Sequence, residues 1–202
     1  MKPNPYADAP RLPEGESIDP RELVGAGLEP IELEIGPGRG GFMFERLAAE
    51  PAVRIVGLEI RRKWASIVDA RLKARGYGDR ARVFAEDARD VMPRFVERSL
   101  AVVYLHFPDP WWKKRHQKRL VMAPDFAKVL VRALVQGGGL FLQTDVEERA
   151  LAYEDMLSSN PGLVPAGERA RTDENPFSAR SPRERRALTD GLPIYRLHYR
   201  RA

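Results

Sequence analysis

The chain has 202 residues, of which 43% are hydrophobic, enough for one globular domain with a continuous core. It contains no cysteine, which excludes disulfides, thiol nucleophiles and cysteine-bound zinc, and with only three histidines we expect no metal site. Its 34 lysines and arginines exceed its 29 acidic residues, for a formal net charge of +5. A net positive charge of this size indicates an acidic partner only where the basic residues cluster.

Residues 1–28 are rich in proline and charge and show no sustained period. We therefore expect an extension that packs loosely or orders on binding. No apolar run is long enough to span a membrane, and residues 1–15 lack the apolar core of a signal peptide. These features predict a soluble, cytoplasmic protein without membrane contact.

The first predicted unit is a strand, a glycine turn and a helix. Residues 31–35 alternate apolar and acidic side chains and run directly into Gly36-Pro37-Gly38-Arg39-Gly40-Gly41. Helical spacing follows over residues 42–49. Glycines are needed in such a turn where a ligand approaches the backbone, and the amides at the helix start then face that ligand.

Further strands and helices alternate along the chain. We expect strands at 54–58, 81–85, 100–105, 140–143, 163–164 and 194–199, and helices at 61–75, 91–96, 124–134 and 147–157. Glycines 137–139 are expected to close the helix at 124–134. Alternation of strands and helices predicts an α/β fold with a mostly parallel, doubly wound sheet, in a single domain over residues 1–202.

The fourth strand leads into the most distinctive stretch of the sequence. Phe107-Pro108-Asp109-Pro110 ends the strand abruptly, and the two prolines hold Asp109 at its carboxyl end. Trp111, Trp112 and a basic run over residues 113–119 follow. Such a loop suits a small-molecule site that opens onto a polyanion, although the basic run by itself also fits a solvated surface.

Acidic residues lie at or beside the ends of five successive predicted strands: Glu34, Glu59, Asp87, Asp109 and Asp145. In a doubly wound sheet these ends share one edge, so one ligand can reach most of the acids. Glu59 lies 23 residues after Gly36, where a carboxylate can accept from two ribose hydroxyls. Asp87 would then face the base of the nucleoside.

Gly36, Gly38 and Gly41 also fit the G-x-G-x-x-G pattern of nicotinamide dehydrogenases. Glu34, directly before the turn, argues against that ligand because its charge would repel a pyrophosphate. The same charge suits a ligand with an ammonium or a sulfonium group. S-adenosylmethionine carries both.

These residues resemble the tRNA (guanine-N7)-methyltransferase family, which methylates guanine 46 of tRNA with S-adenosylmethionine. The likeness covers residues 32–201, and its most specific part is the segment from Phe107 to Trp111 with the bases that follow. Supporting parts are the glycine turn, Gly57-x-Glu59, Asp87-Ala88, Thr144-Asp145 and residues 181–196. The resemblance implies the Rossmann-like, seven-stranded fold of class I methyltransferases.

The resemblance also implies site residues. Cofactor ligands fall on Glu34, Gly36, Gly38, Glu59, Asp87, Ala88 and Asp109, and contacts to RNA fall on Lys113, Asp145, Ser181, Pro182, Arg183 and Glu184. It implies tRNA as the partner, no metal, and a monomer or homodimer. The chain departs from the family in having serine at 181, where threonine is usual, leucine at 120, where a second arginine is usual, and a shorter, less basic amino-terminal arm.

Guanine N7 has a free lone pair, so its methylation needs in-line positioning and no proton abstraction. Asp109 is the catalytic candidate because a carboxylate near the acceptor can stabilise the positive charge that develops on the purine, with positioning as its alternative role. Asp145 is placed to accept from guanine N1–H or its exocyclic amine. Trp111 either stacks on the flipped base or serves as a core lid.

Two rival interpretations stay open. An adenine amino-methyltransferase has a similar loop, but it typically carries a second proline where this chain has Trp111. A catalytically inactive RNA-binding relative would keep the basic run but would not need Glu34, Glu59 and Asp87 together. Cofactor binding distinguishes that relative from an enzyme.

Overall fold

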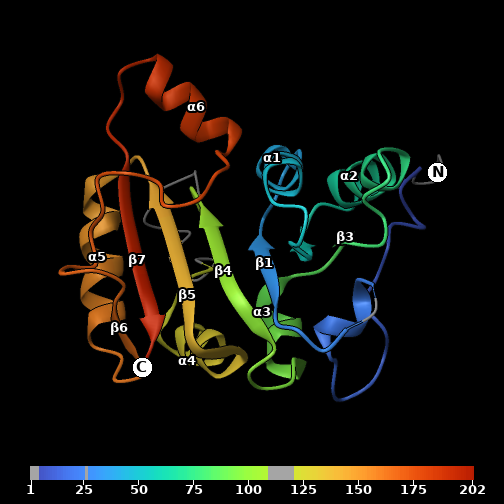
Figure 1. The fold of residues 1–202 in the computed structure, drawn as a ribbon, viewed down its shortest axis with the longest axis horizontal. Helices are drawn as coiled ribbons and strands as arrows, with labels where there is room; N and C mark the ends of the chain where they lie inside the picture. The colour runs from blue at the N-terminus through green and yellow to red at the C-terminus, as the bar shows by residue number, and fades with distance from the viewer. Residues whose placement is uncertain (1–4, 26, 109–120) are drawn as a thin grey trace.

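The computed structural model describes residues 5–25, 27–108 and 121–202. Its centre is a seven-stranded sheet with the order β3-β2-β1-β4-β5-β7-β6 (Figure 1). All paired strands are parallel except β7, which runs antiparallel to β5 and β6. The strands are β1 Ile31–Ile35, β2 Ile55–Leu58, β3 Ala81–Phe84, β4 Leu100–His106, β5 Leu134–Thr144, β6 Leu163–Pro165 and β7 Tyr195–Arg201. The predicted α/β fold with a mostly parallel, doubly wound sheet is confirmed.

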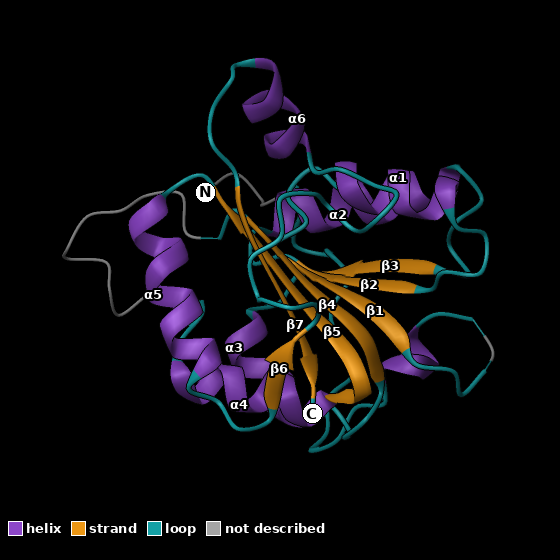
Figure 2. Cartoon of the chain, turned by 60° about the vertical axis from the view of Figure 1, so that its left-hand side comes forward, coloured by secondary structure: helices purple, strands orange, loops and turns teal. Residues whose placement is uncertain are grey.

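Helices cover both faces of this sheet (Figure 2). They are α1 Gly41–Ala49 and α2 Arg62–Ala74 on one face, and α3 Ala88–Val91, α4 Pro124–Ala133 and α5 Glu147–Ser158 on the other. Two sets of buried side chains fill the two layers, one beneath α1 and α2 and one beneath α3, α4 and α5. Because both faces are covered, β1 and β2 are buried along their whole length, even where β1 carries glutamates.

The start of β5 differs from the prediction. Helix α4 ends at Ala133, and Leu134 already pairs with Leu100 of β4. Pairing continues with Gly139 opposite Val102, so β5 has extra residues between these two pairs, and Gly137 takes a φ of 72°. The glycines therefore do not cap the helix as predicted, but form the irregular start of β5. A residue in the left-handed conformation, here Gly137, lets the chain bend back into the sheet.

The helix predicted at 91–96 is also displaced. Asp87 caps α3 by accepting from the Arg89 amide, so the helix begins at Ala88. It gives way at once to the short 3₁₀ helix η2 Met92–Arg94, because Pro93 has no amide to continue the α-helical ladder. The apolar spacing was sufficient to predict a helix here, and the capping aspartate determined its start.

The amino-terminal segment is docked on the core instead of packing loosely. Leu12, Ile18 and Val24 are buried with the side chains beneath α3 and α4, and Ile18 forms a parallel bridge with Phe95. The 3₁₀ helix η1 Pro20–Leu23 lies within this segment. The side chain of Arg54 donates to the carbonyl oxygens of Val24, Gly27 and Glu29. The apolar residues that reach the core here are single residues spaced among prolines. They follow neither a helical nor a strand period, so the sequence pattern did not predict their burial.

A helix that we did not predict, α6 Pro182–Thr189, lies beyond the carboxyl ends of the strands (Figure 1). Ser181 is its N-cap, and the hydroxyl of Ser181 accepts from the Glu184 amide at 3.1 Å. The start signal Ser-Pro-x-Glu is present in the sequence, but the helix is too short and too charged to show an apolar period. Within the described ranges, no helix is both long and apolar enough to cross a membrane.

Candidate functional site

A cavity of about 430 Å³ opens at the carboxyl ends of β1, β2, β3 and β4. The chain leaves the sheet in opposite directions from β1 and β4, and open α/β sheets bind ligands at such a switch point. Four of the residues expected to hold a cofactor line this cavity: Gly36, Glu59, Asp87 and Ala88. Ile60, His106, Phe107 and Pro108 also line it. The sheet therefore brings residues from four strand ends to one hollow.

The glycine turn meets this cavity at its first residue, Gly36. Gly36 has a φ of 73° and Gly38 a φ of 56°, a left-handed region that side chains with a Cβ rarely adopt. At Gly36 a Cβ would meet no atom within 4 Å, so the backbone conformation requires glycine there, and the space beside it stays open. A ligand can approach the main chain of the turn at this point.

Glu59 directly follows β2 and is only 2% exposed. Its Oε2 accepts from the Gly38 amide at 2.9 Å, and its Oε1 accepts from the amide and side chain of Arg61 at 3.0 and 2.9 Å. The glutamate thus ties the glycine turn to the end of β2. A carboxylate has about four acceptor positions, so room remains for further donors from a ligand.

Asp87 lies at the end of β3 and caps α3. The Arg89 guanidinium donates to its carboxylate and so holds the pKa of Asp87 below its ordinary value, and the Arg89 amide acts in the same direction. Ala88 and Arg89 line the cavity beside it. This corner therefore presents an ionised acid, a small side chain and a cation to a ligand.

The fourth strand end contains a strained residue. Phe107 has a φ of 50°, and its amide donates to the carbonyl oxygen of Gln143 at 2.7 Å. A left-handed conformation costs an aromatic residue of the order of 1–3 kcal/mol and is retained where the surroundings demand it. Arg149 of α5 donates to the Pro108 carbonyl oxygen at 3.0 Å. Asp109 and Lys113, two of the predicted site residues, lie outside the described residues.

Glu34 does not line the cavity but lies directly behind it. Its Oε1 is 3.0 Å from Nδ1 of His106, which does line the cavity. The two side chains are 3% and 4% exposed. Among the described residues, Glu34 Oε2 and His106 Nε2 have no hydrogen-bond partner. An unsatisfied pair of this kind is costly to bury and calls for an explanation.

The residues expected to contact RNA fall into two groups. Asp145 and Arg183 form an ion pair above the strand ends, with the arginine side chain 54% exposed and the aspartate 17% exposed. Ser181 and Glu184 are buried. Pro182 packs against the start of α1, where a Cβ on Gly41 would overlap its ring. Helix α6 thus leans on the same glycine turn that lines the cavity.

Glu184 is fully buried. It accepts from Gln143, Asn175 and Arg196 at distances between 3.0 and 3.2 Å. These contacts join α6 to β5, to β7 and to the segment before the helix. The carboxylate therefore holds α6 in place and presents no free oxygen at the surface.

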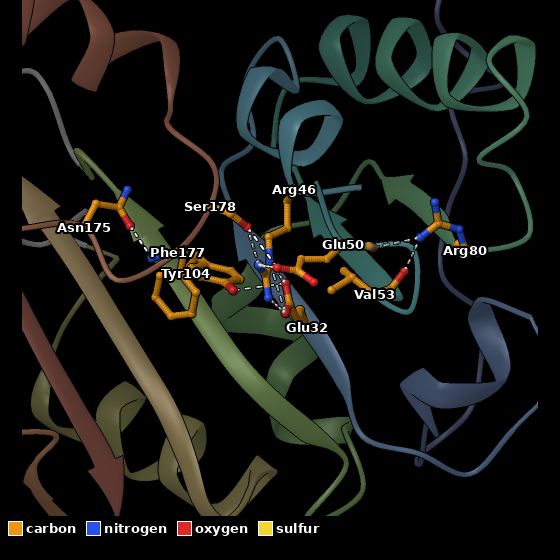
Figure 3. Close-up of polar contacts among 9 residues, drawn as sticks. All are labelled: Glu32, Arg46, Glu50, Val53, Arg80, Tyr104, Asn175, Phe177 and Ser178. Carbon is orange, nitrogen blue, oxygen red and sulfur yellow. Dashed lines mark hydrogen bonds and ion pairs between the residues drawn. The ribbon is translucent and has the colours of Figure 1, made fainter. Parts of the chain in front are cut away.

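A second buried network attaches residues 175–178 to α1 (Figure 3). Arg46 of α1 donates to Glu32 at 2.7 Å and to the Ser178 hydroxyl at 3.2 Å, and the Tyr104 hydroxyl donates to Glu32 at 3.0 Å. Burial, with the nearby Glu32 charge, raises the pKa of the Tyr104 phenol above its ordinary value. The network keeps the segment before α6 against the sheet.

Sequence reasoning missed His106, Arg149 and the partners of Glu184. Each acts through a contact with a residue at least nine positions away in the chain. For His106, the only local signal was its place two residues after Tyr104, on the same face of a strand. Arg149 sits in a charged helix and carried no signal.

Comparison with known proteins agrees with this geometry. Residues 28–197 match a family model described as a putative methyltransferase. A tRNA (guanine-N(7)-)-methyltransferase of Myxococcus xanthus is 41% identical over 83% of this chain and 81% of its own length. A protein of the same name from Rhodopirellula baltica is 36% identical over 99% of this chain and 78% of its own.

Solved structures share the fold at low sequence identity. The geranyl diphosphate C-methyltransferase from Streptomyces coelicolor has a TM-score of 0.59 and 16% identity, over 91% of this chain and 74% of its own. The aminoglycoside resistance methyltransferase NpmB1 has a TM-score of 0.53 and 17% identity, over 86% of this chain and 87% of its own. At these identities the likeness concerns the fold alone.

Proposed function

Because the chain belongs to the tRNA (guanine-N7)-methyltransferase family, we propose that it transfers the methyl group of S-adenosylmethionine to N7 of guanine 46 in tRNA. It acts as one methyltransferase domain over residues 1–202, in the cytoplasm, with tRNA as its macromolecular partner and as a monomer or homodimer. The observation that carries the proposal is the cavity at the ends of β1 to β4, with its left-handed glycine turn and acidic walls.

The described residues fit S-adenosylmethionine. We assign Glu59 to the ribose hydroxyls and Asp87 with Ala88 to the adenine end; the support is that all three line the cavity, beside the ends of β2 and β3. The exposed side chain of Ile60 offers an apolar surface between them. Gly36 and Gly38 let the ligand approach the backbone, and Glu34 provides negative charge behind the turn.

When bound, S-adenosylmethionine supplies a methyl group activated by its sulfonium. The protein's residues have to hold the base in line with that group and need not remove a proton, because guanine N7 carries a free lone pair. We assign to Asp109 the stabilisation of positive charge on the purine. Asp109 directly follows Pro108, whose carbonyl oxygen Arg149 holds at the edge of the cavity.

On the RNA side we assign selection of guanine to Asp145, which directly follows β5 and pairs with Arg183 of α6. Its ion pair with Arg183 leaves further acceptor positions on the carboxylate for guanine N1–H or the exocyclic amine. Lys113 and Arg183 are assigned to phosphate contacts. Ser181, Pro182 and Glu184 are assigned an indirect part in RNA binding, since their contacts hold α6 over the strand ends.

The test is tritium transfer from labelled S-adenosylmethionine into unmodified tRNA, followed by identification of the labelled nucleoside. We expect N7-methylguanosine, and we expect no label in a transcript whose guanine 46 is replaced by adenine. Label in an adenine would favour the amino-methyltransferase. Binding of tRNA without any transfer would favour an inactive relative.

A further inference from the structure

Helix α2 and the glycine turn beside it carry an excess of basic side chains. Between residues 61 and 75 the only acid is Asp69, which is buried and already pairs with Lys73 and Arg82. The remaining exposed bases of this region form what we call the α2 basic surface: Arg39, Arg62, Lys63, Arg71 and Arg75. Among the described residues, no acid lies within ion-pair distance of any of them. The surface is therefore a set of uncompensated positive charges.

Aromatic rings order most of this surface. Its cations lie 4.7 to 5.4 Å from the centres of two rings: Arg39 and Lys63 over Trp64, and Arg71 and Arg75 over Phe44. Phe44 belongs to α1, which lies beside α2 (Figure 1). A cation–π contact is weak at an exposed site, but it restricts a long side chain, so less conformational entropy is lost when that side chain binds a ligand.

The bases at the start of α2 do not stabilise the helix. Arg62 and Lys63 lie in its first turn, which contains no acid, and the N-cap residue Arg61 makes no side-chain capping bond. The amino end of a helix carries partial positive charge, so bases are unfavourable there and acids would be favourable. Arg71, in the last turn, does suit the helix. Arg62 and Lys63 thus break a local rule without a structural gain, which is typical of a functional surface.

The α2 basic surface begins at the edge of the cavity. Arg61 lines the cavity, and Arg39 lies within the glycine turn. From Lys63 to Arg75 the helix rises about 18 Å, at 1.5 Å per residue. Phosphates of one strand follow one another about every 3.4 Å along a duplex axis, so this length corresponds to about five phosphates. A row of cations with this length and starting point fits the backbone of a polyanion that places a base in the cavity.

We propose that the α2 basic surface binds the sugar–phosphate backbone of tRNA beside the guanine that enters the cavity. The inference rests on the proposed function, since it takes tRNA as the macromolecular partner. It adds a contact on α2 and the glycine turn to the phosphate contacts assigned to Lys113 and Arg183. Phosphate contacts carry no sequence information, so this surface positions the tRNA and raises its affinity, while the choice of guanine is made elsewhere.

Binding of an unmodified tRNA transcript, measured by filter retention over a series of salt concentrations, tests the proposal. In the double variant Arg62→Gln/Lys63→Gln, the slope of log affinity against log salt should become shallower by up to about two units. At about 0.9 units per contact, affinity should be about 30-fold below wild type at 0.15 M salt and should approach wild type at 1 M salt. In turnover, KM for tRNA should rise and kcat at saturating tRNA should stay unchanged.

Two measurements and a matched control exclude a structural effect. Neither Arg62 nor Lys63 lines the cavity, so calorimetric affinity for S-adenosylmethionine should stay within about twofold of wild type. The thermal unfolding midpoint should not fall, because the first turn loses unfavourable charges. Arg98→Gln/Arg200→Gln also removes two exposed bases, which lie just before β4 and opposite Gly139 at the far ends of the strands. This control should keep the wild-type salt slope.

The absence of cysteine from the chain allows the contact to be mapped directly. Ala70 is exposed on α2, so an iron chelate attached to Ala70→Cys can generate hydroxyl radicals beside the surface. We expect cleavage of the bound tRNA backbone at a short run of nucleotides. The same chelate on Ala52→Cys, an exposed alanine before β2, should produce no such cleavage.

The outcomes separate this inference from the proposed function. A wild-type salt slope in Arg62→Gln/Lys63→Gln, or an equal change in the control, would overturn the α2 basic surface and leave the proposed function intact. A parallel loss of cofactor affinity would overturn it too, by showing that the substitutions disturb the cavity. Binding of anionic phospholipid vesicles that these bases control, with tRNA binding unchanged, would assign the surface to a membrane instead. Wild-type protein that binds tRNA through these bases without methyl transfer would support the surface and refute the proposed function.

Discussion

The sharpest prediction concerns Glu184, which the family resemblance assigns to RNA contact and the structure buries completely. Replacing it by alanine removes the acceptor for Gln143, Asn175 and Arg196 at once. The Arg196 guanidinium, whose side chain is only 8% exposed, would then be left as a buried charge without its acid. We therefore expect Glu184→Ala to destabilise the fold and not merely to weaken RNA binding.

The size of the effect follows from the burial of both partners. Deleting one member of a buried ion pair costs about 3–5 kcal/mol, because the remaining charge stays desolvated. For a domain of 150–250 residues, each kcal/mol lowers the melting temperature by about 2–4 °C, so the midpoint should fall by roughly 6–20 °C. Glu184→Gln should cost less, since its amide oxygen still accepts from one or two of the donors.

Thermal unfolding followed by circular dichroism, without RNA, measures this effect. Asp190→Ala is the matched control, because it breaks an ion pair to Arg186 on the same helix in which the two side chains are 45% and 76% exposed. The control should change the unfolding free energy by less than about 1 kcal/mol. An unchanged midpoint in Glu184→Ala, together with lost tRNA binding, would refute the structural role and show that the carboxylate contacts RNA.

Four further predictions address the cofactor site, the chemistry, the basic run and stability. Glu59→Ala should weaken S-adenosylmethionine binding by about 1.5–3 kcal/mol in calorimetry, and unchanged affinity would remove it from the site. Asp109→Asn should slow single-turnover methylation roughly 10²- to 10³-fold, with rates nearly flat from about pH 6 to 9 in both proteins; a wild-type slope near one that the variant abolishes would mean that the residue removes a proton. Neutralising Arg115 and Lys118 together should flatten the dependence of log tRNA affinity on log salt by up to about two units, whereas an identical slope would make the run a solvated surface. Burial acts to raise the pKa of Asp69, but hydrogen bonds from an arginine, a lysine and a backbone amide outweigh it and lower the pKa on balance. The ionised carboxylate therefore stabilises the fold above the unfolded pKa of about 3.9, and this stabilisation is lost at lower pH. Asp69→Asn should lower the free energy of unfolding, measured in urea, by about 1–3 kcal/mol at pH 7 and by much less at pH 3. An equal loss at both pH values would contradict this prediction.

Local sequence was enough to predict most strands and the place of the cavity. Short apolar runs that stop at glycine, an acid or a proline-containing loop predicted β1 to β4 within one residue of their observed bounds. A parallel sheet places the carboxyl ends of its strands at one edge, so Gly36, Glu59, Asp87 and Ala88 were expected to come together. They line a single cavity. These features depend on contacts between near neighbours and on one general rule of topology.

The tertiary structure alone decided how the buried polar groups are paired. Glu34 meets His106 across 72 residues, and Glu184 meets Gln143 across 41, because the register of the sheet and the docking of α6 set those distances. The amino-terminal segment docks through isolated apolar residues. Helix α6 is too polar to show an apolar period, and it is stabilised by its serine cap and by buried polar partners. A sequence records which side chains carry charge. Which of those charges find a partner, and which remain for a ligand, is determined only when distant strands are brought into register.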